Sequence, residues 1–88
     1  MKIKKGFVVR VVGGESIAVP VGELSKNFHG MITLNETAKF LWDYFQEDHT
    51  PDEALALFLE TYEVDEDVAK ADIKAFIETL AKNNFLEK

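Results

Sequence analysis

The sequence predicts an α+β fold in which a three-stranded antiparallel sheet is followed by three helices. The first third of the chain is rich in β-branched residues and is interrupted by a Gly-Gly pair, which is typical of strands joined by a hairpin. The rest of the chain repeats apolar residues every three or four positions behind helix-capping residues, which is typical of amphipathic helices. The 88 residues allow one modest core, so we expect a single domain over residues 1–88. This order of elements is compatible with a winged helix-turn-helix.

Two β-branched runs, at residues 7–12 and 16–21, are predicted to pair as a hairpin. The Gly-Gly pair at 13–14 separates them, and glycine adopts the positive φ of a primed turn without steric cost. Pro20 has no N–H to donate to a ladder. The second strand should therefore lie at a sheet edge near its end, or stop pairing there.

The chain is then predicted to change from strand to helix within a few residues. A link over residues 21–30, with Phe28 as its expected anchor, leads into a short third strand at Met31–Leu34. Asn35 follows as an N-cap, because its side chain can accept a backbone N–H of the first helical turn. The apolar face of this first helix is Ala38, Leu41, Trp42 and Phe45. We expect the core to close on the indole of Trp42, which buries a large apolar area.

The second helix has the clearest start in the sequence. Thr50 is predicted as its N-cap, Pro51 fits the first helical position, and Glu53 completes a capping box. The helix is expected to end near Glu63, and Asp65 is expected to cap the third helix. The apolar face of the second helix is Ala54, Leu55, Phe58, Leu59 and Tyr62.

The third helix is predicted to run to about Lys82, where Asn83 and Asn84 provide a left-handed stop before residues 85–86 fold back. Its core stripe is Ala69, Ile73, Phe76, Ile77 and Leu80. A second stripe beside it consists mostly of small residues, namely Val68, Ala71, Asp72, Ala75 and Thr79. Such a stripe usually lets a neighbouring helix pack closely, and the alternative is that it leaves a shallow groove.

Charge divides the chain into a basic first part and an acidic second part. The whole chain has 16 acidic and 10 basic residues and a net charge of −6. Residues 1–34 hold five basic and two acidic residues, a net +3, whereas residues 35–88 hold five basic and fourteen acidic residues, a net −9. Binding to nucleic acid depends on Lys and Arg that neutralise phosphates, so the acidic helices argue against it. A winged-helix DNA-binding regulator is therefore the second choice of function.

Residues suited to catalysis or to metal binding are sparse. The chain has no cysteine, and His29 and His49 lie too far apart for a zinc motif. Ser16 and Ser25 lack a glycine elbow, and the run at 65–67 lacks the glycine and the distal glutamate of a calcium loop. We therefore expect no catalytic residue, no metal and no cofactor. The sequence also lacks the pattern of a signal peptide and a span of about 18 apolar residues, so we expect a cytoplasmic protein with no membrane partner.

Several segments resemble one family when they are taken in order. After the hairpin come FHGMITLNETAKFLWDYF at 28–45, TPDEAL at 50–55, YEVD at 62–65 and ADIKAFIETLAKNNFL at 71–86. The most specific part is LNETA followed by LW, placed after a glycine-containing loop. In this order the segments resemble the PqqD family, the peptide-binding modules called RiPP recognition elements, over about residues 7–86.

The resemblance implies a peptide-binding adaptor with a winged-helix shape. Members of the family hold the leader segment of a ribosomally made precursor peptide and present it to a modifying enzyme, often a radical SAM maturase. The leader adds as a strand along the third strand and lies against the third helix. Carried over to this chain, the implied peptide-binding residues are Met31, Ile32, Thr33, Leu34, Asp72, Ala75, Phe76 and Thr79.

Elementary strand chemistry agrees with this mode of binding. An open sheet edge presents unpaired N–H and C=O groups, which are a template for an added strand. Alternation along the third strand means that one pair of its side chains should face the core and the other the groove or solvent. The basic first part of the chain suits an acidic leader. The sequence does not distinguish the pyrroloquinoline quinone pathway from related pathways, and it leaves a homodimer open.

Overall fold

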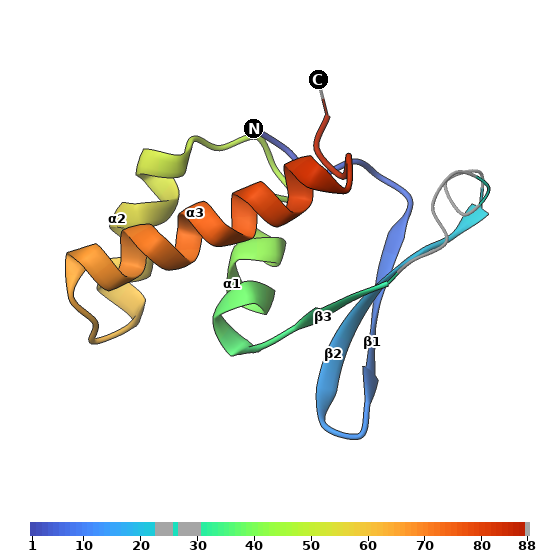
Figure 1. Ribbon diagram of the computed structural model, residues 1–88, viewed down its shortest axis with the longest axis horizontal. Coiled ribbons are helices and arrows are strands. Elements are labelled where there is room, and N and C mark those ends of the chain that lie inside the picture. The colour runs from blue at the N-terminus through green and yellow to red at the C-terminus, as the bar shows by residue number, and fades with distance from the viewer. Residues whose placement is uncertain (23–25, 27–30, 88) are drawn as a thin grey trace.

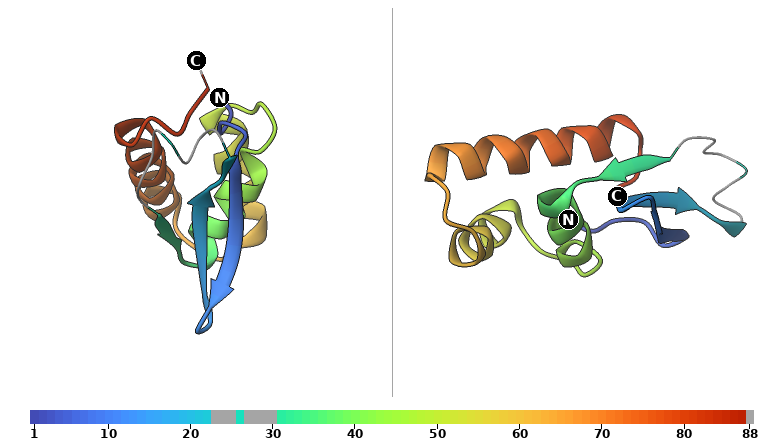
Figure 2. Two further views of the ribbon diagram at one scale, coloured as in Figure 1. Left: turned by 90° about the vertical axis from the view of Figure 1, so that its right-hand side faces the viewer. Right: turned by 90° about the horizontal axis from the view of Figure 1, so that it is seen from below.

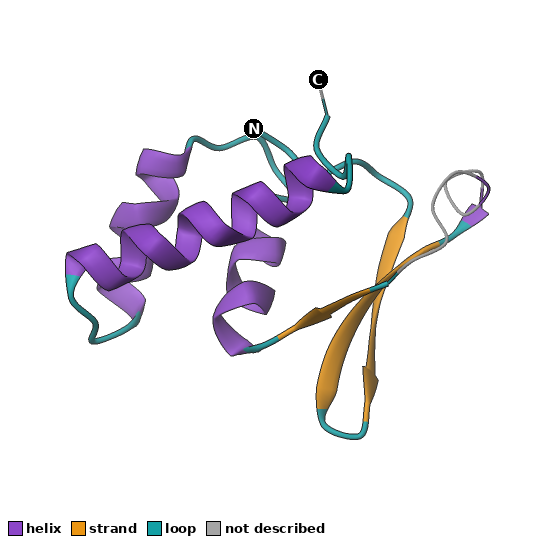
Figure 3. Ribbon diagram, viewed as in Figure 1, coloured by secondary structure: helices purple, strands orange, loops and turns teal. Residues whose placement is uncertain are grey.

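Strands come first along the chain and helices second, and the helices gather on one face of the sheet (Figures 1 and 3). The structure, a computed structural model, describes residues 1–22, 26 and 31–87. Ser25, Phe28 and His29 of the predicted link lie outside the described residues. The elements are β1 (Phe7–Val12), β2 (Glu15–Pro20), β3 (Ile32–Leu34), α1 (Glu36–Tyr44), α2 (Pro51–Thr61) and α3 (Glu66–Lys82). This order confirms the predicted α+β, winged-helix-like fold.

The sheet is antiparallel and has the strand order β1-β2-β3. The turn glycines at 13–14 have φ values of 60° and 82°, so a tight primed turn pairs Val12 with Glu15. This pairing brings Glu15 into the ladder and shifts β2 one residue toward the N-terminus relative to the prediction. β2 is the central strand, and its pairing with β3 stops at Ala18, before Pro20 is reached. Pro20 is still paired with Phe7 of β1 but has no partner on the β3 side, so β2 lies at a sheet edge near its end, which is the first of the two expectations.

The helix starts lie where the capping signals predict them. The side chain of Asn35 accepts the backbone N–H of Ala38 at 2.9 Å. Thr50 and Glu53 form the predicted capping box: each side chain accepts the other residue's backbone N–H, at 3.1 Å and 2.8 Å. Asp65 occupies the N-cap position of α3, but its side chain makes no capping hydrogen bond. The third helix therefore starts at the predicted residue without the predicted side-chain cap.

The end of α2 comes earlier than the sequence predicts. The helix stops at Thr61 rather than near Glu63, because Tyr62 has an extended backbone with φ −120° and ψ 142°. The Tyr62 ring packs against Phe40 and Phe58, with ring centres 5.4 Å and 4.9 Å apart. Burying this ring turns the chain out of the helix before the joint that leads to α3.

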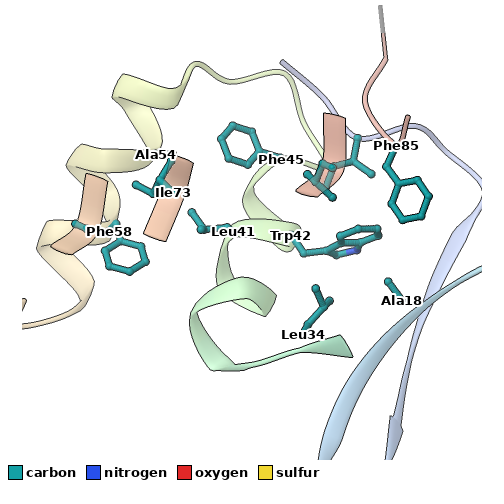
Figure 4. Close-up of a cluster of buried hydrophobic side chains, with 12 residues drawn as sticks. Ala18, Leu34, Leu41, Trp42, Phe45, Ala54, Phe58, Ile73 and Phe85 are labelled. Atoms are coloured by element: carbon teal, nitrogen blue, oxygen red, sulfur yellow. The ribbon is translucent and has the colours of Figure 1, made fainter. Parts of the chain in front are cut away.

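The core has two aromatic centres, whereas the sequence pointed to Trp42 alone (Figure 4). Trp42 lies on the sheet side, where its ring meets Phe7 edge to face at 5.4 Å. The ring of Phe85 also packs against Phe7, with ring centres 4.5 Å apart, so Phe85 is buried as expected. Phe45 and Phe58 fill the space between the helices and have no exposed surface. Sheet and helices are therefore held by separate aromatic groups of one continuous cluster.

Residues 1–6, to which the sequence assigned no structure, form a strap that joins the two ends of the chain (Figure 1). Ile3 is almost fully buried and pairs with Leu86 as an isolated bridge. Its N–H also donates to the C=O of Phe45 at 2.9 Å. Asn84 has a φ of 61°, which confirms the predicted left-handed stop and turns the chain back toward the strap.

Candidate functional site

The outer edge of β3 presents open backbone groups. In a regular antiparallel ladder, successive residues of a strand bond to opposite sides. The N–H of Val21 donates to the C=O of Gly6 at 2.7 Å, so odd-numbered residues of β2 face β1 and even-numbered residues face β3. The register of β2 with β3 is Ser16 to Leu34, Ile17 to Thr33 and Ala18 to Ile32. The N–H and C=O of Thr33 therefore point away from the sheet, and nothing in the described part of the chain pairs with this edge.

The side chains of β3 divide between two faces. Leu34 is buried and Ile32 is half-buried against the core, whereas Thr33 is exposed. Met31 lies just outside the strand and is 63% exposed. The pair that faces the helices is thus Ile32 and Leu34, which the sequence left undecided.

A groove of about 240 Å³ lies between β3 and α3, which run beside each other in the right-hand view of Figure 2. The first turn of α1 also contributes to its wall. The lining residues are Ile32, Thr33, Leu34, Asn35, Thr37, Ala38, Leu41, Asp72, Ala75, Phe76, Thr79 and Leu80. All the site residues implied by the resemblance are among them except Met31. The small stripe of α3 therefore borders an open groove over Asp72, Ala75 and Thr79.

The polar side chains of the groove are mostly engaged within the protein. The Thr79 hydroxyl donates to the C=O of Ala75 at 2.9 Å, and the Thr37 hydroxyl donates to Oδ1 of Asn35 at 3.1 Å. The carboxylate of Asp72 makes no hydrogen bond or ion pair with the described residues. The groove is thus a largely apolar channel in which the side chains of Asn35, Thr37 and Thr79 are bonded internally, and Asp72 adds a negative charge without a partner among the described residues.

The sequence pattern did not predict that α1 would contribute to the wall of the groove. Ala38 and Leu41 were assigned to the core alone, and Thr37 was given no role. The signal was present, because only Asn35 separates β3 from α1. A helix that starts one residue after a strand must place its first turn at the end of that strand.

The charges near the groove do not suit phosphate. Asp72 is its one ionisable lining residue, and the basic residues of the first part of the chain do not line it. On α3, Lys70 lies 3.1 Å from Glu66 and Lys74 lies 4.0 Å from Glu78. Carboxylates therefore accompany two of the three lysines on the helix that would enter a DNA groove, which disfavours the DNA-binding alternative.

Two other hollows lack this combination of features. One, of about 310 Å³, lies between α2 and α3 and touches no strand. The other, of about 420 Å³, lies beside the hairpin turn; it also touches Thr33 and Leu34 of β3, but it has no wall from α3, and the charged residues Glu15, Glu36 and Lys39 border it. No three His, Asp or Glu side chains in the described ranges come together as a metal site. His49 stacks on Tyr44, with ring centres 3.9 Å apart, as part of the packing of the α1–α2 joint.

The fold and the groove define a small winged-helix-like binding domain with an open sheet edge. No helix in the described part of the chain is both long and apolar enough to span a bilayer. The family model described as "Coenzyme PQQ synthesis protein D (PqqD)" matches residues 15–86. The chain therefore belongs to the PqqD family, as its motifs predicted.

A solved structure has the same fold. It is described as "TbiB1 in Complex with the TbiA(beta) Leader Peptide" and matches with a TM-score of 0.73. The two sequences are 22% identical, and the match covers 99% of this chain and 95% of the other. No curated protein sequence matches the chain significantly. The structural likeness confirms the winged-helix-like arrangement of sheet and helices.

Proposed function

We propose that this protein is a RiPP recognition element: it binds the leader segment of a ribosomally made precursor peptide and presents it to a modifying enzyme. The observation that carries the proposal is the open backbone of Thr33 beside an apolar groove. Membership of the PqqD family supports it, as does the likeness to TbiB1, whose structure contains a leader peptide. The role needs no catalytic group and no cofactor.

The bound leader forms a fourth strand along β3. Its residue opposite Thr33 exchanges main-chain hydrogen bonds with that residue, and its side chain points to the same exposed face. The two neighbouring leader residues point to the face of Ile32 and Leu34 and so enter the groove. Because the groove is lined mostly by apolar residues, we expect apolar leader side chains at these two positions. The leader residue between them faces solvent, so many side chains should be accepted there.

The affinity is moderate because the leader is ordered only on binding. A peptide that is disordered when free loses conformational entropy as it becomes a strand, which offsets part of the main-chain and apolar contributions. A dissociation constant of about a micromolar fits such a balance. This strength also allows release after modification.

The modifying enzyme is a second partner in this proposal, and a radical SAM maturase is the candidate from the family. The product is pyrroloquinoline quinone or a related peptide-derived compound, made in the cytoplasm. The leader itself is to be sought in the short open reading frame nearest the gene.

An NMR titration of the labelled protein with that leader tests the proposal. We expect shifts concentrated at residues 31–34 and around Ala75, with calorimetry giving the affinity. A folded protein that shows no response to the leader contradicts this function for that peptide. Duplex DNA at low salt serves as the control, and saturable shifts on α3 with DNA alone would favour the regulator instead.

A further inference from the structure

The groove between β3 and α3 continues past the end of the strand. β3 has three residues and extends about 10 Å, whereas the 17 residues of α3 extend about 25 Å. The two elements run in opposite directions in the right-hand view of Figure 2, so the first turns of α3 lie beyond the end of β3. The lining there consists of Thr37, Ala38 and Leu41 of α1 and of Asp72, the first α3 residue of the groove. These four residues form the α1 end of the groove.

The stripe of α3 that borders the groove continues to Val68. The positions Val68, Asp72, Ala75 and Thr79 are spaced by three or four residues, so they lie along one line of the helix. The last three line the groove, and Val68 is the next position on the line, one turn beyond Asp72. Its apolar side chain is 48% exposed. The α1 end of the groove therefore has an uncovered apolar side chain at its margin.

The geometry of strand addition determines which leader residue reaches this place. A leader residue that exchanges both main-chain hydrogen bonds with Thr33 belongs to a strand antiparallel to β3. The leader residue opposite Leu34 then comes before it and the one opposite Ile32 after it, and these two form the inner pair that enters the groove. The next side chain on the same face belongs to the leader residue two positions before the one opposite Leu34, about 7 Å further along. This third residue lies past the end of β3.

We propose that the leader carries a large apolar side chain at this third residue, which packs at the α1 end of the groove, against Ala38 and Leu41 on one wall and Val68 on the other. Leu41 is buried and Ala38 is half-buried, so they form a floor, whereas Val68 has apolar surface left to cover. The inference rests on the proposed function and adds a requirement to it: the leader has apolar residues at three alternate positions.

The third residue is recognised by its side chain alone. Asn35 follows β3 as the N-cap of α1, and its side chain accepts the Ala38 N–H, so the backbone turns into the helix at this point. Main-chain pairing, which accepts almost any sequence, therefore ends at Leu34. A carboxylate at the third residue would be repelled by that of Asp72. This position is thus suited to distinguishing one leader from another, even when the leader as a whole is acidic.

The other edge of the sheet shows that open backbone alone does not provide such a subsite. Gly6 bonds to β2 through its C=O, so the even-numbered residues of β1 face β2. The N–H and C=O groups of Val9 and Val11 therefore face outward. β1 lines none of the three hollows, however, so a strand added there would meet main-chain groups without a hollow beside them.

Calorimetry with variants of both partners tests the inference. The probe is a synthetic peptide with the leader sequence of the short open reading frame nearest the gene, together with copies in which single residues are changed to alanine. Val68→Asn should weaken binding of the unchanged leader about fivefold, because one apolar contact is lost. The fold should persist, since valine and asparagine have similar helix propensities, and circular dichroism checks this. Ala81→Asn, at an exposed position of α3 outside the groove, is the control and should bind with unchanged affinity.

Combining the two sets of changes identifies the contact. Alanine should weaken binding at three leader positions, each two residues from the next. The loss caused by Val68→Asn should disappear with the peptide that has alanine at the third residue, the N-terminal one of the three. It should persist with peptides that have alanine at either residue of the inner pair. Coupling of Val68 to the inner pair instead overturns the inference.

The variant Thr33→Pro distinguishes failure of this inference from failure of the proposed function. If Thr33→Pro loses the leader while a folded Val68→Asn protein binds it as tightly as the original chain, the leader pairs with β3 without using the α1 end, and the inference is wrong. If the original chain does not bind the leader at all, the proposed function fails and this inference fails with it.

Discussion

The two edges of the sheet expose the same backbone chemistry but have different surroundings. β3 has three residues and lies beside a groove that two helices complete, whereas β1 has six residues and lines none of the three hollows described above. Main-chain bonds give affinity that depends little on sequence, and side-chain pockets give specificity. The short edge is therefore suited to selecting one peptide, whereas the long edge offers backbone groups without a pocket that would select a partner.

Proline substitution separates the two edges most sharply. Thr33→Pro should weaken leader binding about 100-fold or more, because it removes the outward N–H, leaves a peptide C=O unpaired and places a ring in its path. The fold should survive, since this N–H does not bond to β2. Val11→Pro is the matched control on the other edge and should bind the leader normally. Calorimetry measures the leader affinity of both variants. If a folded Thr33→Pro protein binds the leader with full affinity, the leader does not bind as a strand added along β3.

Filling the groove should have the next largest effect. Ala75→Phe places a ring where a leader side chain would enter, so we expect binding to weaken about tenfold. The side chain of Ala75 is exposed, so stability should change little. Ala81→Phe adds the same ring to an exposed position of α3 that does not line the groove, and it should leave the affinity unchanged. Equal losses in the two variants would show that the groove is not the binding surface.

The charge of the leader can be determined from Asp72. If the leader is acidic, as the basic first part of the chain suggests, Asp72→Asn should tighten binding by a few-fold, since an exposed charge interaction is about 1 kcal/mol or less. The tightening should fade in high salt. Weaker binding of the variant would instead show that Asp72 pairs with a basic leader residue.

A change far from both edges should affect stability and leave recognition intact. Thr50→Ala removes the hydroxyl that accepts the Glu53 N–H, which should cost about 1 kcal/mol and lower Tm by about 4–8 °C. Leader affinity at room temperature should be unchanged. Thermal unfolding followed by circular dichroism, with Thr50→Ser as the control that keeps the cap, measures the effect.

Lowering the pH should slightly reduce the stability that the same capping box contributes to the folded protein. The backbone N–H of Thr50 bonds to the Glu53 carboxylate and, with a smaller contribution from His49, lowers the pKa of that carboxylate. Because the pKa of Glu53 is lower in the folded state than in the unfolded state, its charge stabilises the folded protein. This stabilisation is fully present above the unfolded pKa of about 4.3 and is lost as the pH falls through the folded pKa. Chemical denaturation from pH 6 to pH 3 should therefore show a shallower decline for Glu53→Gln. If the free energy of unfolding declined equally in both proteins, protonation of the Glu53 carboxylate would not contribute to the loss of stability in acid.

Local signals predicted much of the fold. The Gly-Gly turn, the Asn35 cap and the Thr50 capping box each involve residues within a few positions of one another, and their chemistry determines the backbone almost alone. The same locality explains why the helix starts were predicted better than the end of α2. That end depends on the Tyr62 ring, which packs against Phe40 far away in the sequence.

Non-local features could not be predicted from the pattern. Ile3 lies in a segment to which the sequence assigned no structure, and only its bridge to Leu86 shows why it is buried. The groove residues of β3 and α3 came from the family resemblance, since no spacing rule relates residue 33 to residue 75. Met31 was named with them because the third strand was expected to begin one residue earlier than it does.

The strap pairs Ile3 with Leu86, so the N-terminal and C-terminal segments lie next to each other on the domain. A domain whose ends meet can be inserted into a surface loop of another protein without stretching either one. It can also be circularly permuted by a short linker, with new ends opened elsewhere. Both edges of the sheet would keep their geometry in such rearrangements, so the same domain could serve as a separate protein or as an inserted part of a larger one.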